Sequence, residues 1–110
     1  MRTFDTGATR DDNTHKVDYF GFLSPKAIRA FGAYMHKHRF QADGVVRSAD
    51  NWKKGIPISA YVESLTRHQI EFMDAVSDGR WAEADEIACA LWFNIQGYLH
   101  ERQTARKDSL

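Results

Sequence analysis

The chain has 110 residues, of which 15 are basic and 15 acidic, so its formal net charge at pH 7 is zero. This balance argues against a nucleic acid polymer or an anionic membrane surface as the main partner. The length predicts one domain, residues 1–110, whose small core favours oligomerisation. A single cysteine and the lack of a long apolar run predict a cytoplasmic protein without a membrane span.

The first segment, residues 1–23, is rich in Gly, Asp, Thr and Asn and has neither a helical nor a strand period. This predicts an irregular arm. It ends in the aromatic residues Tyr19, Phe20 and Phe22, which we expect to anchor it to the body.

A first helix is predicted from Pro25 to about Arg39. Ser24 offers a capping hydroxyl before a proline at the first helical position, which is typical of a helix start. The apolar face that follows has helical spacing, and its members are Ile28, Phe31, Met35 and His38.

A long loop follows, residues 40–57, with turn signals at Asp43-Gly44 and around Gly55. Long ordered loops in small domains are usually functional. Trp52 or Tyr61 could offer a flat face to a base, whereas Trp52 could also simply anchor the loop. The cations that could bind a triphosphate are Arg47, Lys53, Lys54 and, on the next helix, Arg67.

Two further helices are predicted, one capped by Ser59 and ending near Gly79, the other beginning at about Arg80. The expected buried stripe of the second helix is Val62, Leu65, Gln69, Phe72 and Val76, with Tyr61 and Met73 at its edges. That of the third helix is Trp81, Ala84, Ala88, Leu91, Ile95 and Tyr98. The polar tail, residues 103–110, is expected to fray.

The fold class is therefore all-α: three main helices, with the second and third forming an antiparallel pair and the first packed across them. A second apolar patch on the third helix consists of Cys89, Trp92 and Phe93. We expect a second copy to cover it and complete a four-helix-bundle-like core, the alternative being that the N-terminal arm covers it.

Polar residues gather on two helix flanks. At about 100° per residue, His68 and Glu71 share one flank of the second helix, and Glu83, Glu86 and Asn94 share one flank of the third. If these flanks face each other, they could hold Mg²⁺ or Mn²⁺ between oxygen ligands. The alternative is ordinary solvated surface charge.

Six motifs stand in order along nearly the whole chain. They are Gly7-Ala8-x-Arg10, Lys16-x-Asp18-Tyr19-x-Gly21-Phe22-Leu23-Ser24-Pro25, Tyr34-Met35-x-Lys37-His38-Arg39, Asn51-Trp52-x-Lys54-Gly55-Ile56-Pro57, Ser64-x-x-Arg67-His68 and Glu86-x-x-Cys89-Ala90-x-x-Phe93-Asn94-x-x-Gly97-Tyr98-Leu99-His100-Glu101. In these motifs the chain resembles the phage-encoded dATP/dGTP diphosphohydrolases, in particular their N-terminal-type domain. That family is similar to the MazG-type all-α nucleotide pyrophosphohydrolases.

The resemblance implies a homodimer or homotetramer that hydrolyses a purine deoxynucleoside triphosphate to the monophosphate and pyrophosphate. It would act in the host cytoplasm and adjust the nucleotide pool during phage infection. MazG-type enzymes hold Mg²⁺ or Mn²⁺ with an E-x-x-E pair on one helix and an E-x-x-D pair on the next. The matching positions here are His68-x-x-Glu71 and Glu83-x-x-Glu86, and an alternative register is Glu71-x-x-Asp74 with Glu86-x-x-Cys89.

The resemblance also implies roles for single residues. The metal ligands would be Glu71, Glu83 and Glu86, with His68 as a further ligand or as the group that orients the attacking water. Phosphate contacts would come from Lys54 and Arg67, and base or sugar contacts from Asn51, Trp52 and Asn94.

Two other functions stay open on the sequence alone. One is a noncatalytic helical adaptor, and the other is a nucleotide sensor that binds without hydrolysis.

Overall fold

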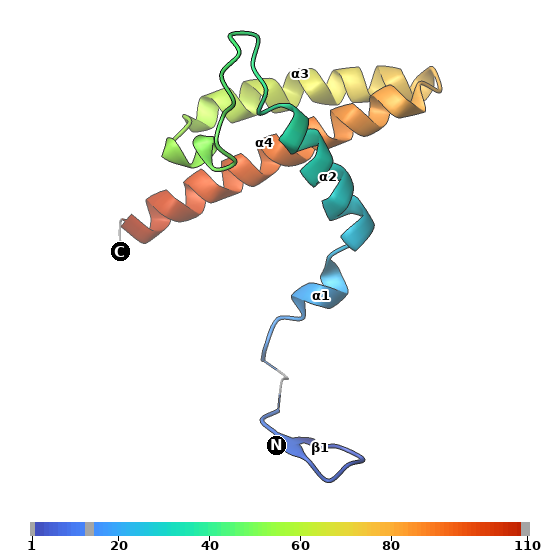
Figure 1. Ribbon diagram of the computed structural model, residues 1–110, viewed down its shortest axis with the longest axis vertical. Helices are drawn as coiled ribbons and strands as arrows, with labels where there is room; N and C mark the ends of the chain where they lie inside the picture. The colour runs from blue at the N-terminus through green and yellow to red at the C-terminus, as the bar shows by residue number, and fades with distance from the viewer. Residues whose placement is uncertain (1, 13–14, 109–110) are drawn as a thin grey trace.

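The centre of the fold is a long antiparallel helical hairpin (Figure 1), made of α3 (Ile58–Ser77) and α4 (Trp81–Asp108). The computed structural model describes residues 2–12 and 15–108. Gly79 turns the chain between the two helices with a φ of 69°, a left-handed conformation that glycine adopts without steric cost. The predicted all-α class with three main helices is confirmed.

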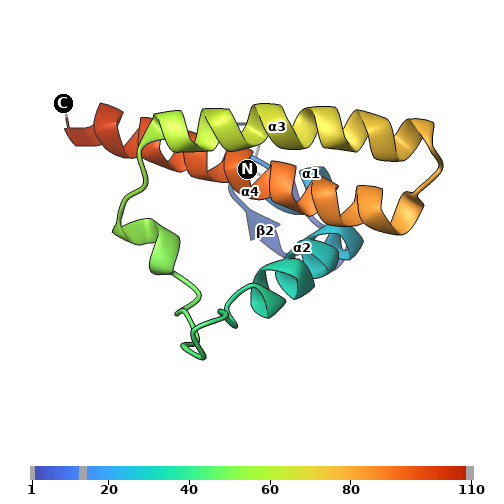
Figure 2. The same ribbon diagram turned by 90° about the horizontal axis from the view of Figure 1, so that it is seen from above.

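The third main helix, α2 (Pro25–Lys37), packs on α4 and not on α3 (Figure 2). It begins as the sequence predicts, because the Ser24 hydroxyl accepts a hydrogen bond from the Ala27 N–H at 3.2 Å. The ring of Phe31 stacks on Trp92 with 4.6 Å between centroids. At its far end Lys37 Nζ lies 2.6 Å from Glu86 Oε2, and both side chains are about half exposed.

The core between α3 and α4 is small. Its central cluster is Ala75, Ala84 and Ile87, with Phe72, Val76 and Leu91 packed against it. Farther from the turn, Tyr61 is only 2% exposed and lies against Gly97. None of the described helices is long and apolar enough to cross a membrane.

Both predicted stripes are partly wrong. The contact side of α3 includes Tyr61 and Ala75, whereas Val62 is exposed. On α4 the predicted Trp81, Ala88, Ile95 and Tyr98 are exposed. Of the predicted stripe Ala84 is buried, and the other buried residues of α4 are Ile87, Ala90, Asn94 and Gly97. Small residues on this side of α4 let the two helices approach closely. The buried face of α4 is therefore not the face that carries its largest apolar residues.

Two predicted helix ends differ as well. Ser59 is not a cap, because α3 begins at Ile58 with Pro57 in the capping position and no side-chain cap bond. The φ of Pro57, −58°, already suits a helix entry. The predicted fraying of the tail is wrong as far as residue 108, because α4 continues to Asp108. Residues 109–110 lie outside the described part.

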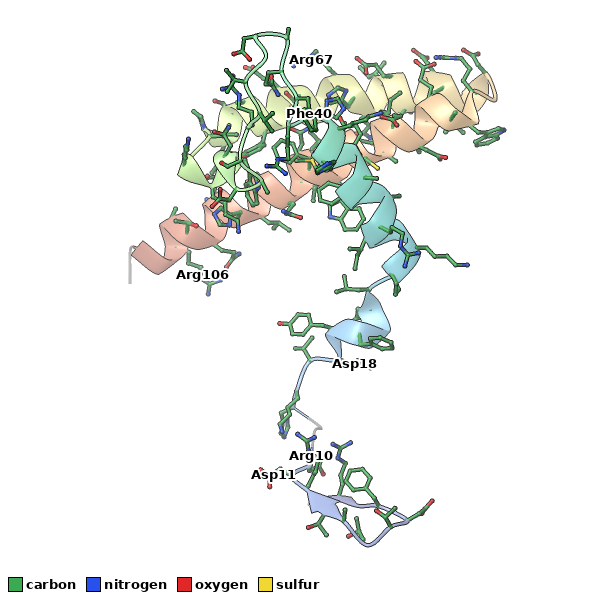
Figure 3. The ribbon with its side chains drawn as sticks, in the orientation of Figure 1. Arg10, Asp11, Asp18, Phe40, Arg67 and Arg106 are labelled. Carbon is green, nitrogen blue, oxygen red and sulfur yellow. The ribbon has the colours of Figure 1, made fainter. Side chains whose placement is uncertain are left out.

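The N-terminal arm extends away from the helices (Figure 1) and contains more structure than predicted. Strands β1 (Arg2–Thr3) and β2 (Thr9–Arg10) pair antiparallel, and α1 (Tyr19–Phe22) forms one turn capped by Asp18. Figure 3 shows Arg10 and Asp11 far from the helical body. The arm's aromatic residues Tyr19, Phe20 and Phe22 are 68%, 87% and 82% exposed, so the prediction that they anchor the arm is wrong.

Other parts of the chain, and not the arm, lie against the patch of Cys89, Trp92 and Phe93, and the prediction that a second copy covers it stays a prediction. Phe31 of α2 covers Trp92, and Trp52 and Tyr61 lie edge-on to Phe93 at 6.2 and 5.9 Å. The chain therefore folds its own α2 and loop over this side of α4.

Candidate functional site

A cavity of about 630 Å³ opens between α2, the following loop and α4. Its volume lies within the range of small-molecule sites. Its aromatic lining residues are Tyr34, Trp52 and Phe93. Its basic and titratable lining residues are His36, His38, Arg39 and Arg47, and its polar ones include Gln41, Ser48 and Asn51. The lining thus combines flat apolar surfaces with groups that bind anions.

The loop wall of this cavity is braced by hydrogen bonds within the loop. Where the chain leaves α2 near Phe40 (Figure 3), Phe40 forms an isolated antiparallel bridge with Val46. Arg39 Nε donates to the Arg47 carbonyl oxygen at 2.7 Å, and the Arg47 N–H donates to the Arg39 carbonyl oxygen at 2.7 Å. Asp43 accepts from the Val45 N–H at 2.9 Å, beside Gly44 with its φ of 78°. These bonds hold two arginines at one wall of the cavity.

The other end of the loop is fixed by Trp52 in the short 3-10 helix η1 (Asn51–Lys54). Its ring is edge-on to Phe93 at 6.2 Å and to His100 at 4.9 Å. The Ile56 N–H donates to Glu101 Oε1 at 3.4 Å. Trp52 therefore anchors the loop and also lines the cavity, so the two roles considered from the sequence are combined.

Tyr34 also lines this cavity. Burial raises the pKa of Tyr34, and the nearby Glu86 and Cys89 raise it further. Its ring also contacts His38, with 4.3 Å between centroids. The phenol therefore stays protonated at neutral pH and can donate a hydrogen bond to a ligand.

Of the substrate-binding residues predicted from the sequence, Asn51 and Trp52 line the cavity, whereas three others do not. Lys54 is exposed in η1. Arg67 is exposed on α3, where it donates to the Ser64 hydroxyl at 3.3 Å. Asn94 is buried within the helix pair, and its amide donates to the Ala90 carbonyl oxygen at 2.8 Å.

The predicted catalytic and metal-binding residues are likewise separated. His68 Nδ1 lies 3.1 Å from Glu71 Oε2, so these two meet as predicted. Glu83 instead pairs with Arg80, and Glu86 with Lys37. Within residues 2–12 and 15–108, no three His, Cys, Asp or Glu side chains come close enough to hold a metal ion.

This donor arrangement does not fit a preformed magnesium or manganese site, which needs several converging oxygen ligands. The alternative register fits no better, because Cys89 would have to serve as a ligand. Burial raises the pKa of the Cys89 thiol, and Glu86 and Asp85 add to the shift. The sulfur of Cys89 is also a soft donor, whereas Mg²⁺ and Mn²⁺ prefer oxygen ligands.

Sequence reasoning missed Tyr34, Arg39, Gln41 and Ser48 as parts of the cavity. Arg39 follows directly on the first helix and has the features of an ordinary basic helix end. The one local signal was the motif Tyr34-Met35-x-Lys37-His38-Arg39, which places four cavity-lining residues, Tyr34, Met35, His38 and Arg39, where the helix gives way to the loop.

Comparisons with family models, with curated proteins and with solved structures found no match to this chain. The family resemblance of its motifs therefore stays a prediction.

Proposed function

We propose that this chain binds a purine deoxynucleoside triphosphate in the cavity between α2 and the loop and hydrolyses it to the monophosphate and pyrophosphate. The motif resemblance supports the substrate class and the reaction. The observation that carries the binding step is the cavity itself, in which aromatic rings and two arginines line one space.

The lining chemistry matches the two ends of a nucleotide. Trp52 and Tyr34 offer ring surfaces for a base, and such stacking contributes roughly 1–3 kcal/mol per base. Arg39 and Arg47 carry planar guanidinium groups, each of which can bind two phosphate oxygens at once. The amide of Asn51 can both donate to and accept from a base edge.

The hydrolytic step rests on the motif resemblance. The reaction implied by the resemblance uses Mg²⁺ or Mn²⁺ on Glu71, Glu83 and Glu86, and these three carboxylates do not converge. His68 and Glu71 can hold and move a proton together, since the carboxylate orients the imidazole. Because Glu71, Glu83 and Glu86 do not converge, a second candidate function is a nucleotide sensor that binds without turnover.

One assay separates these functions. The purified chain is incubated with each of the four deoxynucleoside triphosphates and Mg²⁺ or Mn²⁺, and the products are resolved by anion exchange. We expect dAMP or dGMP together with pyrophosphate. Binding by calorimetry without any product would favour the sensor, whereas neither binding nor product would leave the adaptor as the remaining function.

Arginine variants test where the nucleotide binds. We expect Arg47→Gln or Arg39→Gln to weaken binding roughly tenfold or more, because each removes a charge-assisted hydrogen bond to phosphate. Arg29→Gln, on an exposed part of α2 away from the cavity, is the matched control and should bind normally. If Arg67→Gln weakens binding while Arg47→Gln does not, the cavity is not the site.

A further inference from the structure

The cavity between α2 and the loop has no carboxylate among the described residues that line it. Its charged and titratable lining side chains are Arg39, Arg47, His36 and His38. A Mg²⁺ ion at a phosphate site is usually held by one or two carboxylates together with the phosphate oxygens of the ligand. The cavity therefore presents cationic groups to an anion and no charged oxygen ligand to a metal ion.

The carboxylates close to this cavity are engaged elsewhere or lie outside its lining. Glu86 pairs with Lys37 at 2.6 Å. Glu101 accepts a hydrogen bond from the backbone at the end of the loop, and Asp43 accepts one within the turn. Asp50 belongs to the loop but does not line the cavity. A metal ion that bridged the protein to a phosphate here would thus lack a carboxylate ligand.

The two arginines, by contrast, keep donors for a ligand. Arg39 uses Nε for the Arg47 carbonyl oxygen at 2.7 Å, and among the described residues its terminal nitrogens have no hydrogen-bond partner. Arg47 takes part in the bridge to Arg39 only through its backbone. Its Nη2 lies 3.8 Å from Asp43 Oδ2, which is longer than a hydrogen bond. Since a guanidinium has five N–H donors, both side chains can still donate to phosphate oxygens.

The charge of the lining matches one phosphate group best. A phosphomonoester carries a charge of about −1.5 to −2 at pH 7. The guanidinium groups of Arg39 and Arg47 balance this charge without a metal ion. A triphosphate carries more negative charge, which a divalent cation usually neutralises in part. A nucleoside monophosphate is therefore the ligand whose phosphate this cavity can bind unaided.

We infer that the cavity binds a deoxynucleoside monophosphate as the free anion, its phosphate held directly by Arg39 and Arg47 with no divalent cation between them. The identity of this ligand rests on the proposed function, because the monophosphate is the product of the proposed reaction. The product then competes with the triphosphate for the cavity, so turnover slows as the product accumulates.

The test is isothermal titration calorimetry with dAMP and dGMP, in EDTA and in excess Mg²⁺. We expect binding in EDTA, with a Kd that Mg²⁺ changes by less than about threefold, because the contacts need no metal. Arg47→Gln should weaken binding in EDTA roughly tenfold or more. Arg47→Lys should weaken it less, because lysine keeps the charge but loses the planar pair of donors. Both variants leave the bridge to Arg39 intact, since Arg47 joins it through its backbone.

Two controls separate a direct contact from a general effect of charge. Asp50→Asn removes the loop carboxylate outside the lining, and Arg29→Gln removes an exposed cation of α2 away from the cavity. Both variants should bind the monophosphate normally. The inference would be overturned by binding that requires Mg²⁺, by loss of binding in Asp50→Asn, or by equal weakening in Arg29→Gln and Arg47→Gln.

A turnover assay distinguishes this inference from the proposed function. We expect added dAMP or dGMP to raise the apparent KM for the triphosphate without changing kcat, as a competing product does. Turnover without monophosphate binding in EDTA would overturn the inference alone. Monophosphate binding in EDTA without turnover would support the direct contacts and overturn only the hydrolytic step.

Discussion

Gly97 of α4 is the residue on which the packing of the helix pair depends most sharply. A Cβ atom there would lie 2.2 Å from Cε1 of Tyr61, well inside van der Waals contact. Tyr61 has no room to withdraw, because it is the largest fully buried side chain among the described residues. Only glycine leaves space for the ring.

We expect Gly97→Ala to lower the free energy of unfolding by about 2 kcal/mol, since overpacking outweighs the helix propensity that alanine adds. Urea denaturation followed by circular dichroism measures it. Gly32→Ala is the matched control, because Gly32 is helical and its Cβ would meet nothing within 4 Å. That variant should be slightly more stable than the wild type, and equal effects of the two changes would contradict the packing described here.

Among the three main helices, α2 is the one packed least closely against the others. It is held to α4 by the stack of Phe31 on Trp92 and by the ion pair of Lys37 with Glu86. The ion pair is about half exposed on both sides, so its contribution is at most about 1 kcal/mol. The aromatic stack is therefore the main attachment of this helix.

Replacing Phe31 with alanine should loosen α2 without unfolding the α3/α4 hairpin. We expect a loss of about 1–2 kcal/mol, because the ring is only partly buried. Hydrogen exchange should accelerate in Pro25–Lys37 and stay slow in the middle of α4. Ile28→Ala, a more exposed position on the same helix, is the control and should change exchange less.

The three main helices were predictable from the sequence, but which face of a helix is buried was not. Ser24-Pro25 is a strong signal for a helix start, and Gly79 is a strong signal for a helix end. The start of α2 and the turn between α3 and α4 could therefore be located from the sequence. Which side of α4 is buried depends on Gly97 meeting Tyr61, a contact between residues 36 positions apart. A helical period cannot show that small residues, and not Trp81, face the partner helix.

The candidate site was likewise predictable only in part. Asn51 and Trp52 stood out because an aromatic and polar loop precedes a helix. Arg39 comes to the cavity only because the loop folds back and bonds to Arg47, which no local pattern specifies. The carboxylates Glu83 and Glu86 share a flank of α4, as projected. Each forms an ion pair with a nearby cation, Glu83 with Arg80 and Glu86 with Lys37, so the two do not converge on one site.

At the scale of the whole molecule, the arm is separate from the body (Figure 1). We expect deletion of residues 1–17, which keeps Asp18 as the cap of α1, to change the Tm by less than about 2 °C, because nearly all the described residues of this segment are exposed. Differential scanning calorimetry measures it. A large drop in Tm would mean that the arm docks on the body in solution.

The loop of the cavity has a consequence for motion. Its bonds between Arg39 and Arg47 and its turn at Asp43 are internal, while its far end is attached to α4 through Trp52 and the Ile56–Glu101 bond. We expect a segment that is braced internally and attached at few points to move as one unit, on the ns to μs timescale of loops. Rotation of the Trp52 indole away from His100 would thus release one of its attachments to α4 while every main helix stays folded.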